Sequence, residues 1–130
     1  MKVNKVIAVI PARSGSKSIK DKNIKKLGSK HLIGWSIETC LKSKFISKVY
    51  VSTDSKKYGK IARQYGPVEI LLRPKKISGD FSTDYQMIKH VIENIDDDYG
   101  YIAHIRPTTP LRKLSDVNSA IKNFINSIWK

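Results

Sequence analysis

The sequence predicts an α/β fold in which helices pack on both sides of a mostly parallel sheet. Short apolar runs rich in β-branched residues, the pattern of strands buried on both faces, alternate with stretches whose apolar residues recur at helical spacing. Four such alternations predict parallel strands joined by right-handed helical crossovers. No repeat, low-complexity tract or linker interrupts the pattern, so we expect residues 1–130 to form a single domain.

Four segments have the composition of buried strands: residues 5–10, 48–53, 68–72 and 101–105. Each is followed by a proline or a charged residue: Pro11, Asp54, Arg73 and Arg106. In open parallel sheets, ligands bind beyond the carboxyl ends of the strands. The candidate binding segments are therefore residues 11–23, 53–55, 73–82 and 106–113, and three of these four are rich in Arg, Lys, Ser and Thr.

Four apolar stripes predict the helices, and we expect their aromatic residues to be buried in the core. Thr83 and Gln86 fit a capping box at the start of the third helix, and Ser115 is the expected N-cap of the fourth. Asp54 is interpreted as a helix N-cap rather than a metal ligand. The stripes are Ile33, Ile37, Cys40 and Leu41; Tyr58, Ile61, Ala62 and Tyr65; Tyr85, Ile88, Val91, Ile92 and Ile95; and Val117, Ile121, Phe124, Ile125 and Ile128.

The positive charge of the chain is concentrated near its start. The formal net charge is +14, and residues 1–30 hold nine Lys or Arg residues against one acidic residue, Asp21. This concentration indicates an anionic partner near the first loop. We interpret the scattered lysines after residue 40 as a solubilising surface.

The amino-acid composition also indicates the cellular compartment. The single cysteine, Cys40, excludes an internal disulfide and suits a reducing compartment. The apolar run that ends at Pro11 is too short for a signal-peptide core or a membrane span, so we expect a cytoplasmic protein without a membrane partner. His31, His90 and His104 lack partners at metal-ligand spacing and are interpreted as structural.

The first loop, residues 11–23, combines the features that hold a polyphosphate. Gly15 and the neighbouring serines allow the backbone to approach a ligand and present N–H groups to anionic oxygens. Arg13, Lys17, Lys20 and Lys22 supply positive charge. The P-loop motif G-x-x-x-x-G-K-[ST] is excluded, because Gly15 is followed by Ser16 and no glycine stands at the required upstream position.

Four ordered motifs resemble those of the acylneuraminate cytidylyltransferases, which activate acidic sugars with CTP. The motifs are IPARSGSK at residues 10–17 with Lys22 and Asn23, VSTD at 51–54, LRP at 72–74 with Asp80, and RPTTPLR at 106–112. The resemblance extends from about Val6 to Asp116. The related KDO cytidylyltransferases are similar at the first loop but diverge from the Lys-Asn and Pro-Thr-x-Pro-Leu-Arg pattern.

The resemblance implies a three-layer, Rossmann-like fold of the nucleotide-diphospho-sugar transferase type. The implied reaction joins CTP to a sialic-acid-like nonulosonic acid, a nine-carbon acidic sugar, and gives the CMP-sugar and pyrophosphate. The anomeric hydroxyl attacks the α-phosphorus, and positioning and charge neutralisation carry such chemistry without a covalent enzyme intermediate. The sequence identifies no general base.

The resemblance also assigns roles to individual residues. It implies that the phosphates are held by the catalytic residues Arg13, Lys17 and Lys22, with Ala12 and Ser16, and that Asn23 fixes the nucleoside. Arg73 and the loop to Ser82 would recognise cytosine, although from its position alone Arg73 is expected to form a surface ion pair. Arg106, Thr108 and Thr109 would lie on the sugar side, and Arg106 departs from the glutamine of many relatives.

Members of the family are longer than this chain. The resemblance implies that the ligands of Mg²⁺ and the segment that builds a homodimer lie beyond residue 130, so we expect a C-terminally truncated domain. Such a chain is expected to bind CTP but to lack turnover on its own, and none of its own residues is assigned to the metal.

Two alternatives remain open from the residues alone. The sequence pI of about 9.9 also suits a small basic nucleic-acid-binding domain, although the helical aromatics leave no evident stacking platform. The other alternative is a sugar nucleotidyltransferase specific for a different base. Its usual glycine-rich loop is missing here.

Overall fold

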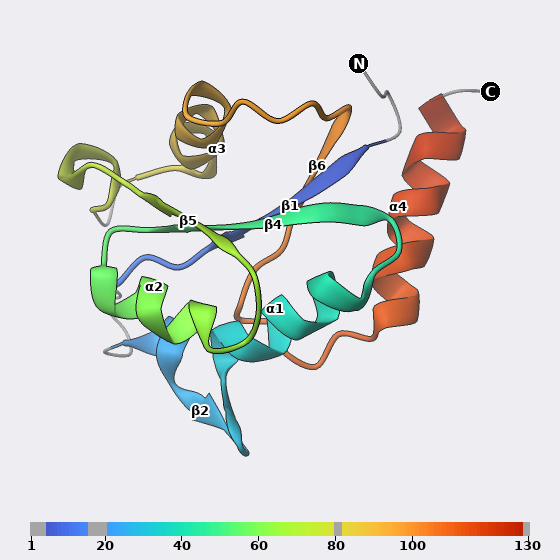
Figure 1. The fold of residues 1–130 in the computed structure, drawn as a ribbon. Coiled ribbons are helices and arrows are strands. Elements are labelled where there is room, and N and C mark those ends of the chain that lie inside the picture. The colour runs from blue at the N-terminus through green and yellow to red at the C-terminus, as the bar shows by residue number, and fades with distance from the viewer. Residues whose placement is uncertain (1–4, 16–20, 80–81, 129–130) are drawn as a thin grey trace.

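A parallel sheet of four strands forms the centre of the fold (Figure 1). The computed structural model describes residues 5–15, 21–79 and 82–128. The strand order is β5-β4-β1-β6, and every pairing in this sheet is parallel. The strands are β1 (Val6–Pro11), β4 (Ile46–Thr53), β5 (Glu69–Leu72) and β6 (Tyr101–His104). The four predicted strands are therefore confirmed, and β4 begins two residues earlier than its apolar run.

Helices cover both faces of this sheet, which confirms the predicted α/β architecture. Figure 1 shows α1 and α2 on one face, α3 on the other, and α4 beside β6. A small antiparallel hairpin and two short 3-10 turns complete the described chain. The bounds are α1 (Leu32–Lys42), α2 (Lys56–Arg63), α3 (Asp84–Glu93), α4 (Leu114–Ile128), β2 (Lys26–Leu27), β3 (Lys30–His31), η1 (Lys22–Ile24) and η2 (Lys75–Ile77).

The continuous apolar run of β1 is explained by a core on each side of the sheet. Ala8 and Ile10 belong to a cluster shared with α1 and α2, whereas Ile7 and Val9 belong to a second cluster with Met87 of α3. Residues 6–10 are all buried. Because successive side chains of a strand point to opposite faces, a strand covered on both sides needs apolar residues at every position.

The predicted start of one helix is confirmed and those of two others are wrong. Thr83 and Gln86 form the capping box of α3. The N-cap of α2 is Ser55, whose hydroxyl accepts a hydrogen bond from Tyr58 N, and not Asp54. Ser115 is not an N-cap, because α4 already begins at Leu114. Asp54 instead binds the first loop, a partner that its local sequence does not reveal.

The helix α4 leaves part of its apolar stripe exposed, at Phe124 and Ile128. Only Val117 of this helix is buried, and Phe124 is 55% exposed. Tyr85 of α3 is 74% exposed, so the expectation that the helical aromatics are buried in the core is wrong for both residues. Between β6 and α4 lies an apolar groove of about 470 Å³, lined among others by Tyr101, Ile102, Val117, Ile121, Phe124 and Ile125.

No helix in the described ranges combines the length and the apolar character that crossing a bilayer requires.

The contact between α1 and Tyr65, which follows α2, depends on a glycine. A Cβ added to Gly34 would lie 2.4 Å from Cζ of Tyr65, whose hydroxyl accepts from His31 N and is 2.7 Å from His31 Nδ1. The ring cannot shift without loss of these bonds. Gly34→Ala is therefore expected to lower the free energy of unfolding by about 1–3 kcal/mol, measured by urea denaturation.

Gly79→Ala is the matched control, because a Cβ there meets no heavy atom within 4 Å. Its unfolding free energy should stay within about 0.5 kcal/mol of the wild-type value. Equal losses in both variants would contradict the packing account.

Candidate functional site

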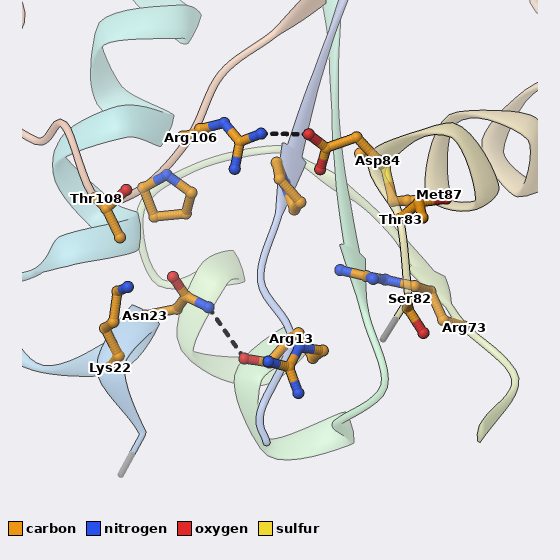
Figure 2. Close-up of a pocket in the computed structure, with 12 residues that line it drawn as sticks. Arg13, Lys22, Asn23, Arg73, Ser82, Thr83, Asp84, Met87, Arg106 and Thr108 are labelled. Carbon is orange, nitrogen blue, oxygen red and sulfur yellow. Dashed lines mark hydrogen bonds and ion pairs between the residues drawn. The ribbon is translucent and has the colours of Figure 1, made fainter. Parts of the chain in front are cut away.

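A polar cleft of about 250 Å³ opens at the carboxyl edge of the sheet (Figure 2). It lies where the parallel-sheet prediction places a ligand site. The side chains around it come from segments far apart in the sequence: the ends of β1, β5 and β6, the turn η1 and the start of α3. The lining residues are Pro11, Arg13, Lys22, Asn23, Arg73, Ser82, Thr83, Asp84, Met87, Arg106, Pro107 and Thr108.

Four cationic side chains meet at this cleft: Arg13, Lys22, Arg73 and Arg106. They come from four separate segments and surround the cleft in Figure 2. Among the described residues that line the cleft, Asp84 is the one acidic residue. Concentrated positive charge in a concave site raises the local concentration of anions, so the cleft is suited to a polyanionic ligand.

The guanidinium of Arg73 is held inside the protein. The residue is only 9% exposed, and its Nη2 and Nη1 donate to the carbonyl oxygens of Ser52 at 3.3 Å and Ile77 at 3.5 Å. Its Nε is buried without a hydrogen-bond partner. Burial lowers the pKa of Arg73, although the nearby charge of Asp54 acts in the opposite direction. The expected surface ion pair is therefore wrong, because the side chain is anchored by backbone carbonyls at the base of the cleft.

The carboxylate of Asp54 fixes the start of the first loop. Its Oδ1 accepts from Ser14 N at 2.9 Å, and its Oδ2 accepts from the Ser14 hydroxyl at 2.7 Å. Partial burial alone would raise the pKa of Asp54, but these bonds and the charge of Arg73 outweigh it and lower the pKa below its usual value. The N–H of Ser14 therefore points to a carboxylate and not to an anionic ligand, which corrects the expectation for that group.

Two elements across the cleft are joined by an ion pair. Arg106 Nη2, beyond β6, donates to Asp84 Oδ2 in the first turn of α3 (Figure 2). Both side chains are more than half exposed, at 57% and 53%. Exposed pairs of this kind are weak and salt-sensitive, so a competing anion can separate them.

The cleft brings together most of the predicted site residues: Arg13, Lys22, Asn23, Arg73, Ser82, Arg106 and Thr108. Ala12 is fully buried and contributes its N–H to Ser52 O, and Thr109 lines the apolar groove between β6 and α4 instead. Ser16, Lys17, Lys20 and Asp80 lie outside the described residues. The sequence interpretation does not include Asp84, because the capping box predicts only the start of a helix.

The cleft residues do not provide a set of ligands for Mg²⁺. Within residues 5–15, 21–79 and 82–128, no three His, Cys, Asp or Glu side chains come together as a metal site requires. Asp54 accepts two bonds from Ser14, and Asp84 is paired with Arg106. The expectation that Mg²⁺ is held by ligands beyond residue 130 stays a prediction.

Comparison with known proteins identifies the family of this chain. The model of a protein family described as cytidylyltransferase matches residues 7–128, which is nearly the whole chain. The chain belongs to this cytidylyltransferase family. The resemblance in the four sequence motifs is thereby confirmed at the level of the family.

Relatives of this cytidylyltransferase chain act on acidic sugars according to their names. An N-acylneuraminate cytidylyltransferase of Escherichia coli O18:K1:H7 is 42% identical over 118 residues, which cover 91% of this chain and 28% of that protein. A CMP-N,N'-diacetyllegionaminic acid synthase of Legionella pneumophila is 34% identical, with 91% and 52% covered. The chain thus spans about half or less of the length of these relatives.

Solved structures of cytidylyltransferases share the fold of this chain. A CMP:2-keto-3-deoxy-manno-octonic acid synthetase complexed with CTP superposes with a TM-score of 0.77 at 20% identity, and the match covers 94% of this chain and 48% of that one. A cytidylyltransferase from Leptospira borgpetersenii gives a TM-score of 0.68 at 23% identity, with 94% and 49% covered.

The cationic cleft predicts that inorganic pyrophosphate stabilises the protein. Its binding should raise the melting temperature, and the increase should shrink as salt is raised from about 0.05 to 0.5 M because exposed charges are screened. Lys22→Ala should weaken pyrophosphate binding about 3- to 10-fold by titration calorimetry, the range of one solvent-accessible hydrogen bond. Lys60→Ala, which removes the same charge from the exposed side of α2, should leave the affinity unchanged.

Proposed function

We propose that this chain is the CTP-binding part of a cytidylyltransferase that activates a sialic-acid-like nonulosonic acid. One observation carries the proposal: Arg13, Lys22, Arg73 and Arg106 converge from four segments on one cleft at the carboxyl edge of the sheet. Family membership supports the nucleotide, and the names of the relatives support the acidic sugar. The products are the CMP-sugar and pyrophosphate.

The triphosphate is assigned to the side of the cleft that carries Arg13 and Lys22. The phosphate oxygens accumulate charge as the anomeric hydroxyl of the sugar attacks the α-phosphorus and pyrophosphate leaves in line. Cationic side chains that are already in place stabilise this charge without reorganisation. Ser16 and Lys17, which follow Arg13 in the same loop, are proposed to add further contacts, and Ala12 supports the loop from the core.

The base and the sugar are assigned to the other parts of the cleft. Arg73 and Ser82 are proposed to recognise cytosine, whose carbonyl and ring nitrogen accept hydrogen bonds, and Asn23 to contact the nucleoside. Arg106 and Thr108 are proposed to receive the carboxylate of the sugar. Thr109 is not part of this assignment, because it lines the neighbouring groove.

Turnover is proposed to need protein surface that these residues do not supply. The chain covers 28% of the Escherichia coli relative and 52% of the Legionella pneumophila relative. The groove between β6 and α4 is apolar and open, as expected of a surface that further polypeptide covers. We therefore propose that residues 1–130 bind CTP, and that Mg²⁺ and a second subunit contribute to the complete enzyme.

A nucleotide panel tests the proposal. CTP should stabilise the protein more than UTP or ATP at equal concentration, as measured by thermal shift and calorimetry. Arg13→Ala and Lys17→Ala should each weaken CTP binding about 10-fold with little change in melting temperature, because each removes one charged contact. Unchanged CTP affinity in both variants would contradict the phosphate assignment.

The same thermal-shift measurement, extended to a random oligonucleotide, separates the remaining alternatives. A salt-sensitive response to a random oligonucleotide, without any response to CTP, would favour a nucleic-acid-binding domain. Preference for another nucleotide would favour a nucleotidyltransferase of different base specificity. Arg73→Lys keeps the charge but loses the planar fork, so it should reduce the preference for CTP over UTP.

A further inference from the structure

The peptide unit between Arg13 and Ser14 is held from two directions. Its carbonyl oxygen accepts from Asn23 Nδ2 at 3.0 Å, and its N–H donates to Asp54 Oδ1 at 2.9 Å. Rotation of this peptide would break both bonds and leave partly buried polar groups unsatisfied. The direction in which the Arg13 side chain leaves the backbone is therefore set by Asp54 and Asn23 together.

The far side of the same loop has an anchor of its own. Tyr58 of α2 donates its hydroxyl to Asp21 Oδ1 at 2.6 Å, and the rest of Tyr58 is buried in the core, with 1% exposure. Asp21 has a positive φ of 52°, a conformation that needs local support in a residue other than glycine. Lys22 follows directly, so the bond from Tyr58 fixes the point at which Lys22 enters the cleft.

Both anchors belong to one stretch of chain, the end of β4 and the start of α2. Asp54 and Tyr58 are four residues apart, and the charge of Asp54 contributes to the raised pKa of Tyr58 after the larger effects of burial and Asp21. A single short segment thus contacts both ends of the first loop. The distance between Arg13 and Lys22 across the cleft depends on it.

We infer that Asp54 and Tyr58 are positioning residues that hold Arg13 and Lys22 at the spacing a polyphosphate requires. The inference rests on the proposed function only in that CTP is taken as the ligand. The inference predicts the opposite of the effect of charge alone, because a carboxylate near an anion site repels the anion and should weaken its binding. The direction of the change in CTP affinity therefore distinguishes the two roles. Removal of Asp54 weakens CTP binding if Asp54 positions Arg13, and strengthens CTP binding if Asp54 only repels the phosphates.

A double-mutant cycle tests this inference. Asp54→Ala is expected to weaken CTP binding about 10-fold, and Asp54→Asn about threefold or less, because the amide oxygen can still accept from Ser14 N. In an Arg13→Ala background, Asp54→Ala should have almost no further effect, since the residue acts through Arg13. An equal loss in both backgrounds, or tighter binding by Asp54→Ala, would overturn the inference.

The second anchor has a parallel test. Tyr58→Phe removes only the hydroxyl and should weaken CTP binding about threefold, with no further loss in a Lys22→Ala background. Asp98→Ala, an exposed carboxylate outside the cleft, is the control and should match wild type. A loss in Tyr58→Phe that persists in the Lys22→Ala background would overturn this half of the inference.

Amide hydrogen exchange keeps the two proposals distinguishable. In the protein without ligand, the Ser14 amide should exchange about 10-fold faster in Asp54→Ala than in wild type, because the acceptor is lost. Wild-type protein that fails to bind CTP yet shows this change would refute the proposed function and leave the anchor intact. Unchanged exchange at Ser14 would refute the anchor whatever the protein binds.

Discussion

The parallel pairing of β1 with β4 on one side and β6 on the other is the constraint on which the rest of the structure depends. Pro11 pairs with Ser52, and Val9 pairs with His104, so three chain segments leave the sheet at one edge. Core clusters on both faces bury β1 completely from residue 6 to residue 10. The first charged loop of the cleft is therefore carried by β1, the most deeply buried of the described strands.

The parts of the fold that depend on local pattern could be predicted from the sequence. Continuous apolar runs gave the four strands, stripes at helical spacing gave the four helices, and Thr83 with Gln86 gave the start of α3. The edge of the sheet that carries the cleft followed from the same reasoning, because parallel strands end together. Seven of the predicted site residues line that cleft for this reason.

Features that depend on partners distant in the sequence could not be predicted. Asp54 looks like a helix cap from its neighbours, yet its partner is Ser14, forty residues earlier. Arg73 precedes a proline in what reads as a surface loop, yet carbonyl groups of β4 and η2 hold it inside the protein. The apolar stripe of α4 has the same pattern as the stripe of a packed helix, although part of it is exposed. The pattern alone does not show whether another part of the protein packs against it.

The ion pair between Arg106 and Asp84 has a consequence for selectivity. An acid that approaches Arg106 must compete with the carboxylate of Asp84, which is already paired with it. Asp84 lies in the first turn of α3, where the helix dipole stabilises a negative charge. A small monocarboxylate is expected to gain little binding free energy when it replaces Asp84 at Arg106. Under the proposed function, a sugar acid that also makes contacts elsewhere in the cleft is expected to displace Asp84, and this ion pair is expected to disfavour acids that bind Arg106 alone.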